Sequence, residues 1–396
     1  MPSGRNRIRV GPRAVVLLVV VGLAGLELGL RHLVGYARRT VTESSARFGW
    51  RLMPDQEREG RKPGVPERIN SRGYRDREWG ETSVNERGRP ARDKGFFRVA
   101  LLGNSVTYGT DLPIERTWGR VLERQLQAEL ERRRDRRRAQ VMNFALPGYV
   151  FAQMARVFED DVVPYRPDVV VVALFPYDVR RMLVSADHPD YPLRRWIVRS
   201  ALHEFLVQEV LGRRGELYAA SADERSAAKE GVDRANRKIL RDPFAPEHAQ
   251  AWDELFRGLE RVRGLAEELS IAVAVVAMPS LEAVADPGRP SGADRLGPWA
   301  AERPSVVFID PQEAFRTATE RLLAEIESTG RSHENVWVRE VLLGAPDFGR
   351  RERLGLRRAG DSPFFFYDPG HYSARGHELL AREVFRALRD RLLPAR

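Results

Sequence analysis

Two short runs that are apolar at almost every position restrict the fold of this chain more than any other feature. They read DVVVVALF at residues 168–175 and IAVAVVA at residues 271–277. A strand that is apolar on both faces needs cover on both faces, as in a parallel sheet between two layers of helices. The two runs therefore predict central strands of an α/β protein.

Strand-like and helix-like segments alternate on either side of these runs. Further strands are predicted at residues 97–102, 140–144 and 305–309, and helices at residues 115–133, 151–163, 248–269, 312–327 and 374–393. The segment between residues 277 and 305 is rich in Gly and Pro and is expected to be a loop. The alternation predicts a three-layer α/β/α sandwich with a mostly parallel sheet.

The same patterns divide the chain into parts. Residues 1–37 are predicted to be a cytoplasmic stub and a transmembrane signal anchor, and residues 38–94 a polar linker that wraps the domain. Residues 95–396 form the predicted α/β domain. Within it, residues 180–246 interrupt the alternation with charged, helix-like sequence and are expected to be an insertion.

The N-terminus has the pattern of a membrane anchor. An apolar run from Ala14 to Leu30, with Glu27 as its one charged residue, follows arginines at positions 5, 7, 9 and 13. A membrane span takes about 20 apolar residues, and the arginines favour a cytoplasmic N-terminus. We expect a single-pass cell-membrane protein with an extracytoplasmic domain. A cleaved signal peptide and a buried helix of a soluble domain are the alternatives.

The basic charge balance does not indicate a nucleic-acid partner. The chain has 66 Lys and Arg against 56 Asp and Glu, a net charge of +10, yet only four of the cations are lysines and the arginines are spread among acids. Solvated faces account for such arginines better than a phosphate-binding patch does. The chain has no Cys, which excludes disulfides, cysteine nucleophiles and thiolate metal sites. No metal or organic cofactor is predicted.

Functional groups in open α/β sheets gather beyond the carboxyl ends of the strands. The first predicted strand leads into GNSVTYG at residues 103–109, which places Ser105 on a tight turn. A hydroxyl there can act as a nucleophile if a base takes its proton; a helix cap is the alternative role. The second leads into NFALPGY at residues 143–149, where the amide of Gly148 could bind an oxyanion. The alternative is a loop glycine needed only for its conformation.

The third element is DPGHYSARGH at residues 368–377, ahead of the last predicted helix. The imidazole of His371 is a suitable general base for a serine hydroxyl. Asp368, on the same loop, could hold the Nδ1–H of that ring and stabilise the imidazolium. His377 falls inside the predicted helix and is expected to be structural.

In this order the three blocks resemble those of the SGNH hydrolase superfamily, the GDSL-type esterases and lipases. NSRGYRD at residues 70–76 is similar to the lead-in of its membrane-anchored bacterial members. The resemblance runs from about this segment to the C-terminus and implies the flavodoxin-like sandwich of that superfamily. It also implies site roles, with Ser105 as nucleophile, His371 as base, Asp368 as its orienting partner, and the amides of Ser105 and Gly148 as the oxyanion hole.

Two positions depart from the family pattern. Asn104 stands where the family usually has Asp, which removes a charge beside the nucleophile but keeps a hydrogen-bonding side chain. A further block of the family usually ends in Asn-Asp and corresponds to FPYD at residues 175–178, so Tyr177 stands where the family has an asparagine that donates to the oxyanion. Losing one such donor costs about 10²–10³ in rate. The phenol of Tyr177 could donate instead, although its ring is longer and needs a displaced backbone.

The leading hypothesis is a membrane-anchored, extracytoplasmic serine esterase that forms an acyl-enzyme on an O-acylated envelope glycan or a lipid. One alternative is an O-acyltransferase of the same fold, with a sugar hydroxyl as acceptor. Another is a non-catalytic envelope binding module whose oxyanion hole has decayed. A phosphate-binding turn after the first strand is a weaker hypothesis, because no Gly-Lys-Ser/Thr follows it.

Overall fold

The computed structural model describes residues 11–30, 42–45, 47–59, 65–80, 91–179, 202, 205–206, 238–239, 242–286, 288–328, 365–368 and 371–392. The contacts divide the chain into two units, residues 1–41 with 187–229, and residues 42–186 with 230–396. The predicted site residues all belong to the second unit.

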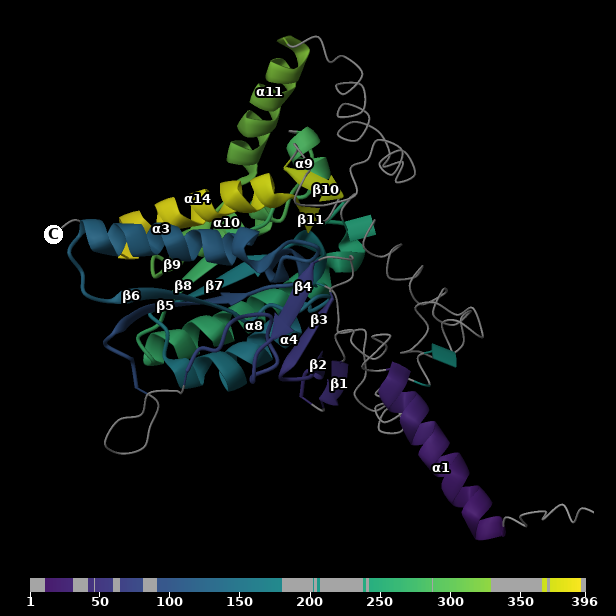
Figure 1. Ribbon diagram of the computed structural model, residues 1–396. Helices are drawn as coiled ribbons and strands as arrows, with labels where there is room; N and C mark the ends of the chain where they lie inside the picture. The colour runs from purple at the N-terminus through teal and green to yellow at the C-terminus, as the bar shows by residue number, and fades with distance from the viewer. Residues whose placement is uncertain are drawn as a thin grey trace, which may run out of the picture. The chain divides into compact units, whose positions relative to one another are not determined.

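A five-stranded parallel sheet forms the centre of the second unit (Figure 1). In sheet order its strands are β6 (Arg138–Asn143), β5 (Phe96–Leu102), β7 (Val169–Leu174), β8 (Ala272–Ala277) and β9 (Val306–Ile309). Numbered along the chain this order is 2-1-3-4-5, the doubly wound arrangement of flavodoxin-like sheets. The strand order reverses between β5 and β7, so the crevice for a ligand is expected beyond the carboxyl ends of these two strands.

Helices cover both faces of this sheet (Figure 1). One face carries α3 (Trp118–Arg132), α9 (Leu281–Ala285), α11 (Gln312–Ser328) and α14 (Ala374–Leu392), and the other carries α4 (Phe151–Val157), α8 (Ala249–Glu268) and α10 (Ala293–Ala301). Successive side chains of β7 alternate between the two hydrophobic cores, and every residue of this strand is buried. The predicted three-layer sandwich is confirmed.

Two local predictions need correction. The segment between residues 277 and 305 is not a plain loop, because it contains α9 and α10. Ser280 starts α9 by accepting a hydrogen bond from Ala283 N at 3.2 Å, and Pro298 is tolerated inside α10. The helix predicted over residues 151–163 is α-helical only to Val157, and it continues as a wide π-turn and a 3₁₀ turn.

The segment expected to be a linker contains regular structure. It includes two antiparallel hairpins, formed by β1 (Thr42–Ser45) with β2 (Gly49–Leu52) and by β3 (Gln56–Glu59) with β4 (Pro66–Ile69). The chain then buries Tyr74, Arg75, Asp76 and Trp79. This short polar stretch therefore packs as part of the α/β domain.

In the first unit, α1 (Pro12–Gly29) is long and apolar enough to cross a membrane, with a mean hydropathy of 1.8. Its apolar side chains are exposed. Near its end, the Glu27 carboxylate accepts a hydrogen bond from Leu202 N at 2.8 Å. Length and composition thus permit a span, while the membrane location and the topology stay predictions.

Candidate active site

Ser105 lies directly beyond the carboxyl end of β5, at the first position of α2 (Ser105–Tyr108). Asn104 caps this single turn, because its side-chain oxygen accepts a hydrogen bond from Val106 N at 2.9 Å. Gly103 has no space for a side chain, since a Cβ there would lie 2.2 Å from a buried threonine hydroxyl. Ser105 itself is half-buried between buried neighbours. The sequence thus forms a tight turn that leaves Ser105 partly exposed.

A buried carboxylate from the next strand fixes the residue before this serine. Asp178 lies in η5 (Pro176–Val179), beyond the carboxyl end of β7. It accepts hydrogen bonds from Asn104 Nδ2 at 2.8 and 3.0 Å and from Phe175 N at 2.8 Å. Both Asp178 and Asn104 are buried. Asp178 was not among the predicted site residues, although a carboxylate shortly after a buried strand is the signal that could have found it.

His371 lies on β11 (His371–Tyr372), just ahead of α14, and is half-buried. The buried residue beside it, Tyr372, donates its hydroxyl proton to the carbonyl of Pro279 at 2.8 Å, beyond the exit of β8. Ser373 N donates to Phe365 O at 2.9 Å. These bonds hold the strand of His371 against the carboxyl edge of the sheet.

The structure brings the predicted nucleophile and the predicted base together. His371 Nε2 lies 2.9 Å from Ser105 Oγ, although 266 positions separate the two residues in the chain. At this distance the two atoms form a hydrogen bond, which permits direct transfer of the serine proton to the imidazole. The contact lies beyond β5, at one side of the switch point of the sheet.

Asp368 is placed through its backbone. It belongs to β10 (Phe366–Asp368), which pairs antiparallel with β11, and it is the register partner of His371. The register shifts between Phe366 and Asp368. The predicted base and its predicted partner therefore occupy facing positions of one short hairpin, at the same edge of the sheet as Ser105.

Gly148 occupies the turn after β6. Tyr149 N donates to Leu146 O at 3.2 Å, and Gly148 has a φ of 80° after Pro147, the pattern of a type II turn. Gly148 is exposed. Leu146 N donates to Gly103 O at 3.3 Å, so this loop is bonded to the loop of the nucleophile. Within the described residues, the amides of Ser105 and Gly148 donate to no protein acceptor.

Tyr177 is half-buried in η5, with its ring centroid 4.6 Å from that of Phe175. Burial raises the pKa of Tyr372 well above its usual value, with a smaller contribution from Tyr177. The described contacts do not join Tyr177 or Gly148 directly to Ser105. Their assignment to an oxyanion hole stays a prediction.

His377 has the structural role expected from its position in the last helix. It is buried in α14, and its Nδ1 accepts a hydrogen bond from Trp118 N at 3.0 Å, at the start of α3. Burial lowers the pKa of His377 to about 3, with smaller contributions from the charges of His371 and Arg75. A neutral His377 thus joins two helices beneath the site.

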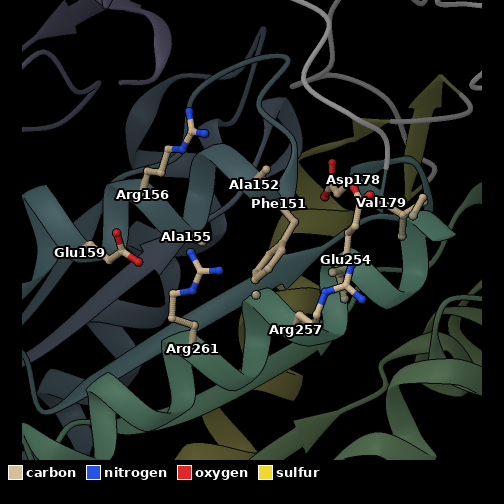
Figure 2. Close-up of a pocket in the computed structure, with 13 residues that line it drawn as sticks. Phe151, Ala152, Ala155, Arg156, Glu159, Asp178, Val179, Glu254, Arg257 and Arg261 are labelled. Carbon is tan, nitrogen blue, oxygen red and sulfur yellow. The ribbon is translucent and has the colours of Figure 1, made fainter. Parts of the chain in front are cut away.

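A pocket of about 320 Å³ lies between α4 and α8 and reaches Asp178 (Figure 2). Figure 2 shows Phe151 between the two helices, and Arg257 and Arg261 along α8. Gly258 permits this close packing, since a Cβ there would lie 2.6 Å from the ring of Phe151. Asp178 therefore connects the wall of this pocket with Asn104, the neighbour of Ser105.

No protein-family model matches the chain, and no curated protein matches it. Among solved structures it is similar to Axe2, an acetylxylan esterase from Geobacillus stearothermophilus (16% identity, 75% of this chain, 96% of that chain, TM-score 0.38). It is also similar to the acetyl xylan esterase AlAXEase (12% identity, 74% and 99%, TM-score 0.37). A third structure is a Bacteroides fragilis protein proposed to be an acylhydrolase (12% identity, 76% and 91%, TM-score 0.33). Likenesses at this level do not assign the chain to a family.

Proposed function

We propose that this protein is a serine esterase that acts through an acyl-enzyme on Ser105. The observation that carries the proposal is the 2.9 Å contact between Ser105 Oγ and His371 Nε2. A histidine at hydrogen-bond distance from a serine hydroxyl at a strand exit is the arrangement that nucleophilic acyl transfer needs.

In the first half-reaction, Ser105 Oγ attacks the carbonyl carbon of an acyl ester while His371 Nε2 takes the hydroxyl proton. The tetrahedral intermediate collapses when the C–O bond to the alcohol breaks, and the protonated His371 gives its proton to the leaving alcohol. The acyl group then remains on Ser105. Asp368 is the proposed partner of the imidazole, through which it holds the ring in position and stabilises its charged form.

In the second half-reaction, His371 removes a proton from a water molecule as the water attacks the acyl-enzyme. The carboxylic acid leaves, and the proton returns to Ser105. A sugar hydroxyl in place of water gives acyl transfer by the same steps, so the acceptor alone distinguishes an esterase from an acyltransferase.

In this proposal the amides of Ser105 and Gly148 donate hydrogen bonds to the oxyanion of each tetrahedral intermediate. Two features support this assignment: neither amide donates to a protein acceptor in the described part of the chain, and the loops that carry them are bonded through Leu146 N and Gly103 O. Tyr177 is the third candidate donor, from the position that holds an asparagine in the family the sequence resembles. Preorganised donors of this kind supply a large part of the rate enhancement in acyl transfer.

The proposed location is the outer side of the cell membrane, with α1 as an anchor. The apolar length of this helix and the arginines ahead of it support that topology. The proposed substrates are O-acylated envelope glycans or lipids, which a membrane-anchored enzyme with an outer catalytic domain meets.

The test is turnover of p-nitrophenyl acetate by the full chain in detergent, with and without a glycan acceptor. We expect hydrolysis by the wild type and none by Ser105→Ala, with unchanged circular dichroism. Transfer of the acetyl group to the glycan would assign the protein to acyltransferases instead. An unchanged rate in Ser105→Ala would remove the serine mechanism.

A further inference from the structure

The turn that carries Ser105 is too short to hold its own geometry. α2 has four residues, and a single helical turn is unstable in isolation because its nucleation is unfavourable. Gly109 ends it in the left-handed region, with a φ of 77°. The carbonyl groups at this end need partners from elsewhere in the fold.

One buried guanidinium supplies those partners. Arg75 Nη1 donates to Gly109 O at 2.7 Å and to Tyr108 O at 3.3 Å, and Nη2 donates to Leu112 O at 2.5 Å. The guanidinium also lies 5.2 Å from the ring centroid of Tyr108. Arg75 is only 1% exposed. In the described part of the chain its hydrogen bonds go to carbonyl oxygens, and no carboxylate forms an ion pair with it.

Burial of a cation is costly unless partner charges or hydrogen bonds replace its contacts with water. A partner charge normally supplies most of this compensation. The domain has a second buried arginine, Arg98, which follows the usual pattern: it bonds Gln140 Oε1 at 2.8 Å and pairs with Asp93 at 3.3 Å. Arg75 differs, because Nη1 bonds the end of the turn of the nucleophile and Nη2 bonds the carbonyl of Leu112 just after it, whereas the buried Nε has no hydrogen-bond partner among the described residues.

Asp76, the residue after Arg75, bonds the exit of β6, where the loop that carries Gly148 begins. Asp76 Oδ2 accepts a hydrogen bond from Asn143 N at 2.9 Å, at the exit of β6, and its other oxygen pairs with Arg120. Asn143 Nδ2 in turn donates to Thr107 O in α2 at 3.2 Å. Arg75 and Asp76 therefore fix the loops of Ser105 and Gly148 relative to each other.

From these contacts we infer that Arg75 is a positioning residue for the reaction at Ser105. It touches no reacting atom; it fixes the end of the turn, and through the turn the direction of the Ser105 hydroxyl and amide. The inference rests on the proposed function, because it requires Ser105 to react. A displacement of about 1 Å at such a group can cost about a hundredfold in rate.

The experiment compares Arg75→Met and Arg75→Lys with Arg98→Met in the full chain. Arg98→Met removes another buried arginine, so it controls for lost stability. We measure kcat and KM with p-nitrophenyl acetate below the unfolding temperature of each variant, and the rate at which a fluorophosphonate labels Ser105. We expect Arg75→Met to lower kcat and the labelling rate by more than about tenfold with little change in KM. Arg98→Met should stay within about twofold of the wild type.

Arg75→Lys keeps the charge but lacks the planar fork, so its kcat and labelling rate should fall between those of the wild type and Arg75→Met. If Arg75→Met does not fold, the lysine variant decides. A lysine variant with the kcat and labelling rate of the wild type would overturn the inference. Absence of any label on wild-type Ser105 would instead remove the proposed function, which separates the two failures.

Discussion

The side-chain amide of Asn104 donates to both carboxylate oxygens of Asp178, at 2.8 and 3.0 Å. This buried pair joins the exits of β5 and β7 and fixes the residue directly before the nucleophile. It also explains why an asparagine suits position 104, since its amide donates where a carboxylate could not. A carboxylate there would face the carboxylate of Asp178 at hydrogen-bond distance.

Asn104→Asp should therefore destabilise the fold. Two buried carboxylates in contact repel each other, and we expect a loss of about 3 kcal/mol in the free energy of unfolding at pH 8. The repulsion raises the pKa of the pair in the folded state, so the deficit should shrink as the pH falls and the pair binds a proton. The double variant Asn104→Asp with Asp178→Asn exchanges donor and acceptor and should recover most of the loss. Urea unfolding checks both; a single variant as stable as the wild type at pH 8 contradicts the pairing.

The lowered pKa of His377 predicts how the free energy of unfolding depends on pH. Its pKa is about 3 in the folded protein, because the ring is buried, against about 6.5 in an unfolded chain. Between these values the unfolded state binds one proton more than the folded state, so His377 lowers stability as the pH falls below about 6.5. The slope is about 1.4 kcal/mol per pH unit.

The matched variant is His377→Asn, which keeps an acceptor for Trp118 N and does not titrate. The wild type should lose stability more steeply than this variant from pH 6.5 downward, and the two should run parallel above pH 7. Urea unfolding at several pH values measures the difference. Parallel curves throughout would mean that folding does not change the pKa of His377, which would contradict its burial as a neutral ring.

Tyr177→Phe tests the third oxyanion donor. The ring contact with Phe175 stays, so the melting temperature should change little. Loss of the hydroxyl should lower kcat for p-nitrophenyl acetate by about a hundredfold with KM nearly unchanged, because the donor acts mainly in the transition state. A decrease of less than about threefold would leave the oxyanion to the two amides.

The sandwich could be predicted because its central strands allow no other environment. β7 and β8 are apolar on both faces, which only a sheet covered on both sides satisfies. Ser105 could be named from its place at a strand exit, and His371 from its residue type just ahead of the last helix. The distance between Ser105 and His371 could not be predicted, because it depends on the strand order and on the hydrogen bond that anchors Tyr372 to Pro279.

The parts of the fold that could not be predicted from the sequence are those in which polar side chains are buried. Arg75 and Asp76 lie in a segment expected to be a polar linker that wraps the domain, yet both are 1% exposed and bond backbone groups near the strand exits. Composition cannot distinguish such residues from surface ones, since their partners are carbonyl and amide groups that every sequence contains. The hairpins β1–β2 and β3–β4 escaped for a related reason, as their short strands show no extended alternation.

The most direct measurement is the rate at which a fluorophosphonate labels Ser105, read by mass spectrometry of the peptide that contains it. The wild type should carry one label at this serine. His371→Asn should label more slowly by about 10³, because the base that activates the hydroxyl is gone while the fold is kept. A folded wild type without label on Ser105, or equal rates in the two proteins, would contradict the account.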